Sequence, residues 1–250
     1  MPVPKHPSDS PLRIALRGAR ENLVPGLVLQ AFALALAIAY YRSLHVHGLV
    51  DRYAALRSQW GVLLPMLTTS LFGCVIPYLY LLLRGGVHGR NQTPVRGLIL
   101  LAYWFYKGWE VDFLYRGLAL IFGEGHDART IVSKMLVDQF IYCVFFAVPV
   151  TWVLYAWLNV DRSWRRLRTE VFVPGWFTRG IFPLLISVWG VWCPAVLIIY
   201  TLPTALQLPM QNLVLCFFTL LVETLSLRRH HQHPSPNLHP PETEMAEELL

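Results

Sequence analysis

Four charged residues interrupt a stretch that otherwise has the composition of a membrane-spanning helix. Lys107, Glu110, Asp112 and Arg116 lie within LILLAYWFYKGWEVDFLYRGLALIF, residues 98–122. Ionisable side chains at membrane depth are costly, and they mark a functional site by default. Their chemistry is that of a polar interior, where charge and hydrogen bonding select what a membrane protein admits.

Helical geometry groups these charges into two pairs. Lys107 and Glu110 share one face as an i, i+3 pair, and Asp112 and Arg116 lie nearly opposite as an i, i+4 pair. Pairing matters in a membrane, because an unpaired charge at its centre costs about 2.5–3.5 kcal/mol or more. Charges on two faces predict a central helix that protein or water surrounds.

An interfacial position is the alternative. Residues 94–122 number 29, and a helix of that length is about 43 Å long, against a hydrocarbon core of about 30 Å. A tilted or overlong helix would place some charges near an interface. Thr93 and Pro94 predict where the helix starts, with a capping hydroxyl and a proline in the first turn. Asp138 and Gln139, in the next apolar stretch, are candidates to meet the four charges.

Composition predicts a polytopic membrane protein. Of 250 residues, 55% are hydrophobic and 14% are charged, whereas soluble domains carry roughly 25% charged residues. Six stretches approach the ~20 residues that a span needs: 23–41, 60–83, 94–122, 135–158, 181–202 and 210–227. The expected fold class is all-α, a transmembrane helical bundle over 23–227 with a basic polar tail before it (1–22) and a disordered tail after it (228–250).

Prolines occur within several of the predicted spans, at Pro65, Pro77, Pro149, Pro183 and Pro194. They predict kinks rather than helix ends, because neighbouring helices can repair the lost hydrogen bonds. The predicted first span has few polar residues and is a candidate peripheral helix.

Basic residues predict the orientation. With six spans, fourteen Lys and Arg residues fall on the side of the two termini and five on the other. The positive-inside rule therefore places both termini on the cytoplasmic, or matrix-like, side.

Other classes of function are disfavoured. The sequence holds no H-E-x-x-H helix and no nucleophile constellation, so we expect no enzyme, no cofactor and no metal site. His45 and His47 are spaced like strand ligands but are assigned to a loop without partners. The basic loops are explained by topology, so nucleic acid is not expected. The lipid bilayer, small solutes and further copies of the chain remain as candidate partners.

Several motifs resemble, in order, those of the Mpv-seventeen/peroxisomal membrane protein 22 family. Lys134, Asp138 and Gln139 reproduce its K-x-x-x-D-Q pattern, and Trp164 with Leu167 resembles its W-x-x-L. WGVWCPAVLIIYTLP resembles its W-x-V-W-P block and contains Trp189, Trp192, Pro194 and Pro203. The resemblance covers roughly residues 98–226, and the predicted second span more loosely, so the family-like region is about 60–227.

The charged stretch aligns with the family motif G-P-x-x-H-x-W-Y. Gly108 and Tyr115 match its glycine and final tyrosine, but Asp112 stands at the histidine position. The resemblance implies a divergent, bacterial-like member, in an inner membrane if bacterial and otherwise in a mitochondrial inner or peroxisomal membrane. It implies a channel or pore-like role for small solutes. From their charge and position in the apolar stretches, we expect the candidate polar interior to consist of Lys107, Glu110, Asp112, Arg116, Asp138 and Gln139. A structural or scaffold protein is the alternative, followed by a secondary transporter and an intramembrane enzyme.

Overall fold

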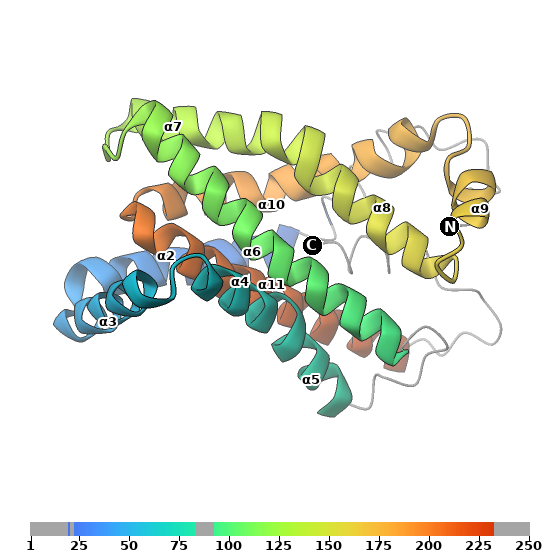
Figure 1. The fold of residues 1–250 in the computed structure, drawn as a ribbon, viewed down its shortest axis with the longest axis horizontal. Helices are drawn as coiled ribbons and strands as arrows, with labels where there is room; N and C mark the ends of the chain where they lie inside the picture. The colour runs from blue at the N-terminus through green and yellow to red at the C-terminus, as the bar shows by residue number, and fades with distance from the viewer. Residues whose placement is uncertain (1–19, 21–22, 84–92, 233–250) are drawn as a thin grey trace.

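The computed structural model describes residues 20, 23–83 and 93–232, and these are helical with short connections and no strand. The all-α class is therefore confirmed for this part of the chain (Figure 1). The predicted N-terminal tail lies outside the described residues apart from residue 20. The predicted C-terminal tail is described only as far as Gln232, and up to there it continues the last helix.

The helices follow one another from the N-terminal to the C-terminal half of the chain. The first half contains α2 (Leu23–Arg42), α3 (Leu44–Trp60), α4 (Leu63–Ser70), the π-helical η1 (Leu71–Val75), α5 (Ile76–Leu83) and α6 (Pro94–Phe122). The second half contains α7 (Ala128–Val137), η2 (Asp138–Ala147), α8 (Val148–Asn159), α9 (Trp164–Arg166), η3 (Leu167–Val171), η4 (Phe177–Ile181), α10 (Phe182–Tyr200) and α11 (Thr204–Gln232).

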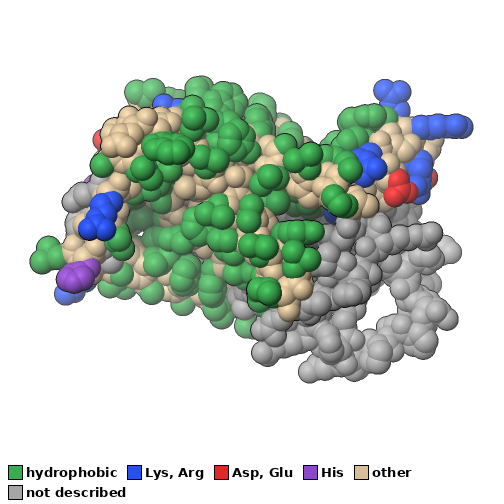
Figure 2. All heavy atoms as spheres, turned by 60° about the horizontal axis from the view of Figure 1, so that its bottom comes forward, with side chains coloured by type: hydrophobic (Ala, Val, Ile, Leu, Met, Phe, Trp, Pro, Cys, Tyr) green, Lys and Arg blue, Asp and Glu red, His purple; other side chains and the backbone are tan. Residues whose placement is uncertain are grey.

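Four helical stretches of the described chain are long and apolar enough to cross a membrane. They are Leu23–Arg42, Leu63–Leu83, Ala128–Asn159 and Phe182–Tyr200, and each overlaps a predicted span. The other two predicted spans are helical, but they are not both long enough and apolar enough to be counted with these four. The charges of α6 reduce its apolar character, and the apolar part of α11 is the shorter Thr204–Leu220. Hydrophobic side chains cover much of the face in Figure 2, as expected for a surface in contact with lipid.

One helix is absent from the sequence prediction. Residues expected to form a loop after the first span form α3, and His45 lies exposed on it. The assignment of His45 and His47 to a loop is therefore wrong. The helix mixes apolar and charged residues in LHVHGLVDRYAALRSQW, which is too polar for a span but compatible with a helix packed on one side.

The prediction that prolines do not end the spans is confirmed. Pro194 lies inside α10, and Pro65 lies inside α4. Pro77, Pro149 and Pro183 each follow a π-helical segment by two residues. A proline ring clashes with the carbonyl four residues earlier, and in all three cases that carbonyl lies in the π-helical segment. Wider π turns thus accommodate the prolines without ending the helix.

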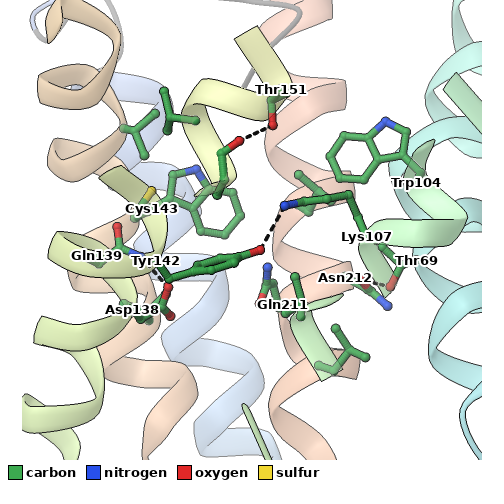
Figure 3. A pocket seen from close by; sticks show the side chains of 18 of the residues that line it. Thr69, Trp104, Lys107, Asp138, Gln139, Tyr142, Cys143, Thr151, Gln211 and Asn212 are labelled. Carbon is green, nitrogen blue, oxygen red and sulfur yellow. Dashed lines mark hydrogen bonds between the residues drawn. The ribbon is translucent and has the colours of Figure 1, made fainter. Parts of the chain in front are cut away.

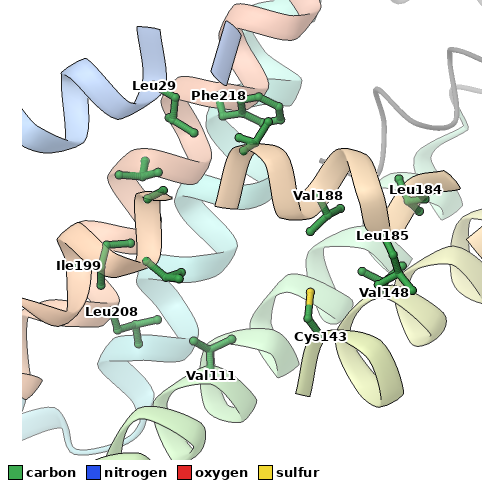
Figure 4. Packing of buried hydrophobic residues seen from close by; sticks show 14 of the residues in the cluster. Leu29, Val111, Cys143, Val148, Leu184, Leu185, Val188, Ile199, Leu208 and Phe218 are labelled. Atoms are coloured by element: carbon green, nitrogen blue, oxygen red, sulfur yellow. The ribbon is translucent and has the colours of Figure 1, made fainter. Parts of the chain in front are cut away.

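The apolar core is centred on α10, which packs against α2 and α11 (Figure 4). Half of its apolar stretch is buried, against 17% for Leu63–Leu83. By contrast α2 buries a single stripe that includes Leu29, Ala33 and Ala37. This is the arrangement expected of a peripheral helix.

Within the described chain α6 is packed on one side only, so the prediction that protein or water surrounds it stays a prediction. Its buried face includes Tyr103, Lys107 and Tyr115, but Phe113 is 64% exposed and Leu120 is 87% exposed. On the buried side, a Cβ on Gly108 would lie 2.4 Å from the carbonyl oxygen of Pro65. The missing side chain therefore allows the backbones of α4 and α6 to meet. At its start, Thr93 caps the helix by accepting from the Arg96 N–H at 3.2 Å, as predicted.

Candidate functional site

Lys107 lies in the middle of α6, about 20 Å from either end at 1.5 Å per residue. Only 6% of it is exposed. Its Nζ donates to Glu110 Oε1 at 2.7 Å and to the Tyr142 hydroxyl at 2.9 Å. The Tyr142 hydroxyl in turn donates to the same Glu110 oxygen. The predicted Lys107–Glu110 pair therefore exists, and a tyrosine from η2 completes a triangle that neutralises a charge deep in the bundle.

The second predicted pair is also formed, but it belongs to a different place. Arg116 Nη2 lies 2.8 Å from Asp112 Oδ2, outside hydrogen-bonding geometry, so this contact is an ion pair. The other carboxylate oxygen, Oδ1, accepts a 2.7 Å hydrogen bond from Arg57 Nη2 on α3. Asp112 is buried, whereas the Arg116 side chain is 54% exposed. This cluster thus lies nearer the C-terminal end of α6, where the side chain of Arg57 reaches it from α3.

Asp138 and Gln139 begin η2 and are both buried. Asp138 Oδ2 accepts a 2.6 Å hydrogen bond from the Tyr200 hydroxyl of α10. Its Oδ1 accepts from Gln139 Nε2 at 3.3 Å. The indole of Trp189 donates to the backbone carbonyl of Gln139 at 2.9 Å. Among the described residues no cation lies within ion-pair distance of Asp138, so neutral donors surround this carboxyl group.

A third group of polar residues comes from α4 and α11. The Thr69 hydroxyl donates to Asn212 Oδ1 at 3.0 Å, and Asn212 Nδ2 donates to the Thr68 hydroxyl at 3.3 Å. Gln211, beside Asn212, accepts from the Tyr115 hydroxyl of α6. Sequence reasoning missed the role of these amides, although two adjacent amides in the apolar stretch LPMQNLV were a usable signal.

These groups meet at a partly open cavity of about 120 Å³ between α4, α6, η2, α8, α10 and α11 (Figure 3). A buried water needs roughly 10–15 Å³ of such space, so the cavity has room for several. Its polar lining consists of Thr69, Trp104, Lys107, Asp138, Gln139, Tyr142, Cys143, Thr151, Gln211 and Asn212. Apolar side chains from α6, α8, α10 and α11 complete the wall.

The structure separates the six predicted residues of the polar interior. Lys107, Asp138 and Gln139 line the cavity, and Glu110 is joined to it through Lys107. Asp112 and Arg116 do not line it. The two faces predicted for the charged helix therefore serve two separate clusters, one at mid-depth and one near the end of α6.

The residues that carry the family resemblance are placed in several ways. Trp192 lines the cavity, Trp189 holds the backbone of η2, Gly108 lies at the α4 crossing, and Tyr115 bonds to Gln211. Lys134 is buried in α7, Pro194 lies inside α10, and Pro203 follows α10. Trp164 is exposed on α9.

The chemistry available in this cavity is hydrogen bonding and charge pairing. Within the described residues there is no group of three or more His, Cys, Asp and Glu side chains that could hold a metal ion. No protein-family model, no curated protein and no solved structure matches this chain.

Proposed function

We propose that this chain is an integral membrane protein of six spans whose partly open cavity admits small polar solutes, as a channel or pore-like protein does. The observation that carries the proposal is Lys107, a buried cation in the middle of a helix that borders a cavity. A buried charge is expensive in a membrane, and a purely structural role is served more cheaply by an apolar side chain.

Six spans follow if α6 and α11 cross the membrane together with the four apolar stretches. Support comes from the 29-residue length of α6, which exceeds the hydrocarbon thickness. Support also comes from the exposed apolar side chains of α6, including Phe113 and Leu120, which form a face suited to lipid. With six crossings both termini lie on one side, the side that also carries most of the basic loops.

The composition of the cavity favours polar solutes. Lys107 is neutralised by Glu110, so the cation presents no uncompensated charge. Amides from Gln139 on η2 and from Gln211 and Asn212 on α11 add donors and acceptors. Such groups replace the water molecules of a solute's hydration shell.

Cysteine accessibility across residues 106–117 tests whether water reaches this cavity. In a background without the four native cysteines, cysteines at Lys107 and Val111 should react with a membrane-impermeant thiol reagent, because both positions line the cavity. Phe113 points away from the bundle and should not react with it. Equal labelling of all three positions, or of none, would contradict a water-lined cavity.

Solute flux tests the function itself. Purified protein in planar bilayers and in liposomes should conduct ions or release small polar solutes. The paired change Lys107→Met/Glu110→Gln should alter the relative rates for different solutes, while Arg166→Met/Glu170→Gln on the exposed linker should not. Bilayers and liposomes that remain silent over a range of voltage and pH would overturn the proposal.

A scaffold protein is the second candidate, and one observation favours it. Lys107 has its neutralising partner three residues away in the same helix, so its charge is already satisfied without a solute. On this reading the double change Lys107→Met/Glu110→Gln alters stability alone. Solute flux through liposomes that contain the native protein, with none through protein-free liposomes, would reject the scaffold hypothesis.

A further inference from the structure

The connection between α8 and α10 carries an unusual excess of arginine. Arg162, Arg165, Arg166 and Arg168 occur within seven residues, and the only acidic residues between 160 and 171 are Asp161 and Glu170. In Figure 2 the basic side chains at the end that bears α9 project beyond the apolar surface.

Both acidic residues are used by a single arginine. Arg166 Nη1 lies 2.8 Å from Asp161 Oδ2, and its Nε lies 2.9 Å from Glu170 Oε1. Arg162, Arg165 and Arg168 are exposed, and no carboxylate of the described residues lies within ion-pair distance of them. The segment therefore presents three guanidinium groups whose charges are not compensated within the described chain.

The backbone of this segment is held in place. The chain turns sharply after α8, where Asp161 and Arg162 adopt left-handed conformations with φ of 55° and 61°. The side chain of Ser163 then caps α9 by accepting from the Arg166 N–H. Leu167 is fully buried and Val171 is 5% exposed, so two apolar side chains anchor the segment to the bundle. The arginines thus project from a fixed platform.

The flanking helices place this platform at a membrane surface. Ala128–Asn159 and Phe182–Tyr200 are both apolar enough to cross a bilayer, and the platform follows the end of one and precedes the other. Trp164 is 61% exposed beside the arginines and packs against Trp157 with ring centroids 5.5 Å apart. Indole side chains favour the boundary between headgroups and hydrocarbon.

We propose that Arg162, Arg165 and Arg168, with Trp164, form a binding site for the phosphate-bearing headgroups of anionic phospholipids. Guanidinium groups bind phosphate through paired hydrogen bonds. The exposed indole inserts beside them at the level of the headgroups. This site is independent of the cavity, and it binds lipid whether or not the protein moves a solute.

The test uses the full-length protein in neutral detergent micelles, titrated with phosphatidylglycerol or phosphatidylcholine. Native mass spectrometry counts retained lipids, and thermal unfolding reports stabilisation. We expect preferential retention of phosphatidylglycerol. The change Arg162→Gln/Arg165→Gln/Arg168→Gln should weaken that retention more than tenfold, since each basic residue near an anionic surface contributes about fivefold.

The matched control carries the same change in net charge elsewhere. Arg42→Gln/Arg52→Gln/Arg129→Gln alters three exposed arginines outside this segment and should retain phosphatidylglycerol like the native protein. The variant Arg162→Lys/Arg165→Lys/Arg168→Lys preserves the charge and should keep most of the binding. Because the three arginines are exposed, unfolding without added lipid should be unchanged.

Three results would overturn the proposal. One is equal loss of phosphatidylglycerol from the linker variant and the control, which would show a general effect of net charge. Another is full retention by the linker variant. The third is stabilisation by inorganic phosphate alone that matches that of phosphatidylglycerol, which would identify free phosphate rather than a lipid as the ligand.

Discussion

Arg57 Nη2 lies 2.7 Å from Asp112 Oδ1, and this contact joins α3 to α6 across 55 residues of sequence. Asp112 is buried and also contacts Arg116, so one carboxylate serves two guanidinium groups. The arrangement explains why an aspartate is tolerated on the packed face of an otherwise largely apolar helix. It also attaches α3, which mixes apolar and charged residues, to α6 through a defined hydrogen bond.

Removal of the Arg57 side chain should loosen α3 before the rest of the bundle. Arg57→Gln should lower stability by about 1.5–3 kcal/mol, the usual range for a hydrogen bond that involves a charged group. The double variant Arg57→Gln/Asp112→Asn should recover part of this loss, because it removes the buried negative charge that the single variant leaves to Arg116. Unfolding in a denaturing detergent measures the total, and hydrogen exchange of residues 44–60 locates it. Fully additive losses would contradict a direct contact.

A methyl group at Gly108 should force α4 and α6 apart. Ala is normally the better helix former by up to about 1 kcal/mol, but here its Cβ would lie 2.4 Å from the Pro65 oxygen and 2.7 Å from Met66 Cα. We expect Gly108→Ala to cost about 1–3 kcal/mol, as overpacking commonly does. Gly117→Ala, in the same helix with open space around it, should be neutral or stabilising. Equal effects at the two positions would show that the crossing is not tight.

The hydrogen bond between Asp138 and Tyr200 can be measured by a double-mutant cycle. Asp138→Asn and Tyr200→Phe should couple by about 1 kcal/mol, within the range measured for hydrogen bonds between helices in membranes. Tyr78→Phe, on an exposed side chain, serves as the control partner for Asp138→Asn and should show no coupling. A cycle with Tyr200 that closes to zero would mean that the contact contributes nothing to the bundle.

Stability at the start of α7 should depend on pH through Asp127. Its carboxylate accepts from the Thr130 hydroxyl at 2.7 Å and from the Thr130 N–H at 3.1 Å. The hydroxyl bond, followed by the backbone bond, lowers the pKa of Asp127 below its ordinary value. Because the folded pKa is depressed, the stabilising cap is present above the unfolded pKa and is lost as the pH falls through the folded pKa. The amide resonance of Thr130 should report this titration.

Asparagine at position 127 provides the comparison for that titration. Asp127→Asn keeps a capping oxygen but cannot ionise, so the Thr130 resonance should stay constant through the acidic range. A titration that persists in this variant would assign the pH dependence to another group.

The sequence allowed prediction of the helical class, of the four apolar stretches and of both charge pairs of α6. Local spacing determines such pairs, and a run of apolar residues needs no partner to be recognised. The sequence was insufficient to predict the hydrogen-bond partners that come from distant segments of the chain. Arg57, Tyr142 and Tyr200 meet the predicted residues only after folding, and nothing in their own neighbourhood marks them.

The charged residues of α6 do not mark which of its sides is packed. Charges on two faces predict a helix that protein or water surrounds, but an exposed arc that carries Trp109 and Phe113 lies between them. Arg116 is long enough to reach back to Asp112 from a half-exposed position, as arginine side chains often do. The position of a charged residue on a helix is therefore a weaker guide to which face is packed than the position of an apolar residue.

The π-helical segments have a consequence for how this chain can change by insertion and deletion. A π turn holds one residue more than the α turn it replaces, so η2 behaves as an α-helix that has accepted an extra residue. Removing one residue between 140 and 146 should restore a regular helix before Pro149. It should also turn Asp138 and Gln139 by about 100° relative to α8, away from the positions they now share with Lys107. The register of η2 thus decides whether Asp138 and Gln139 line the cavity.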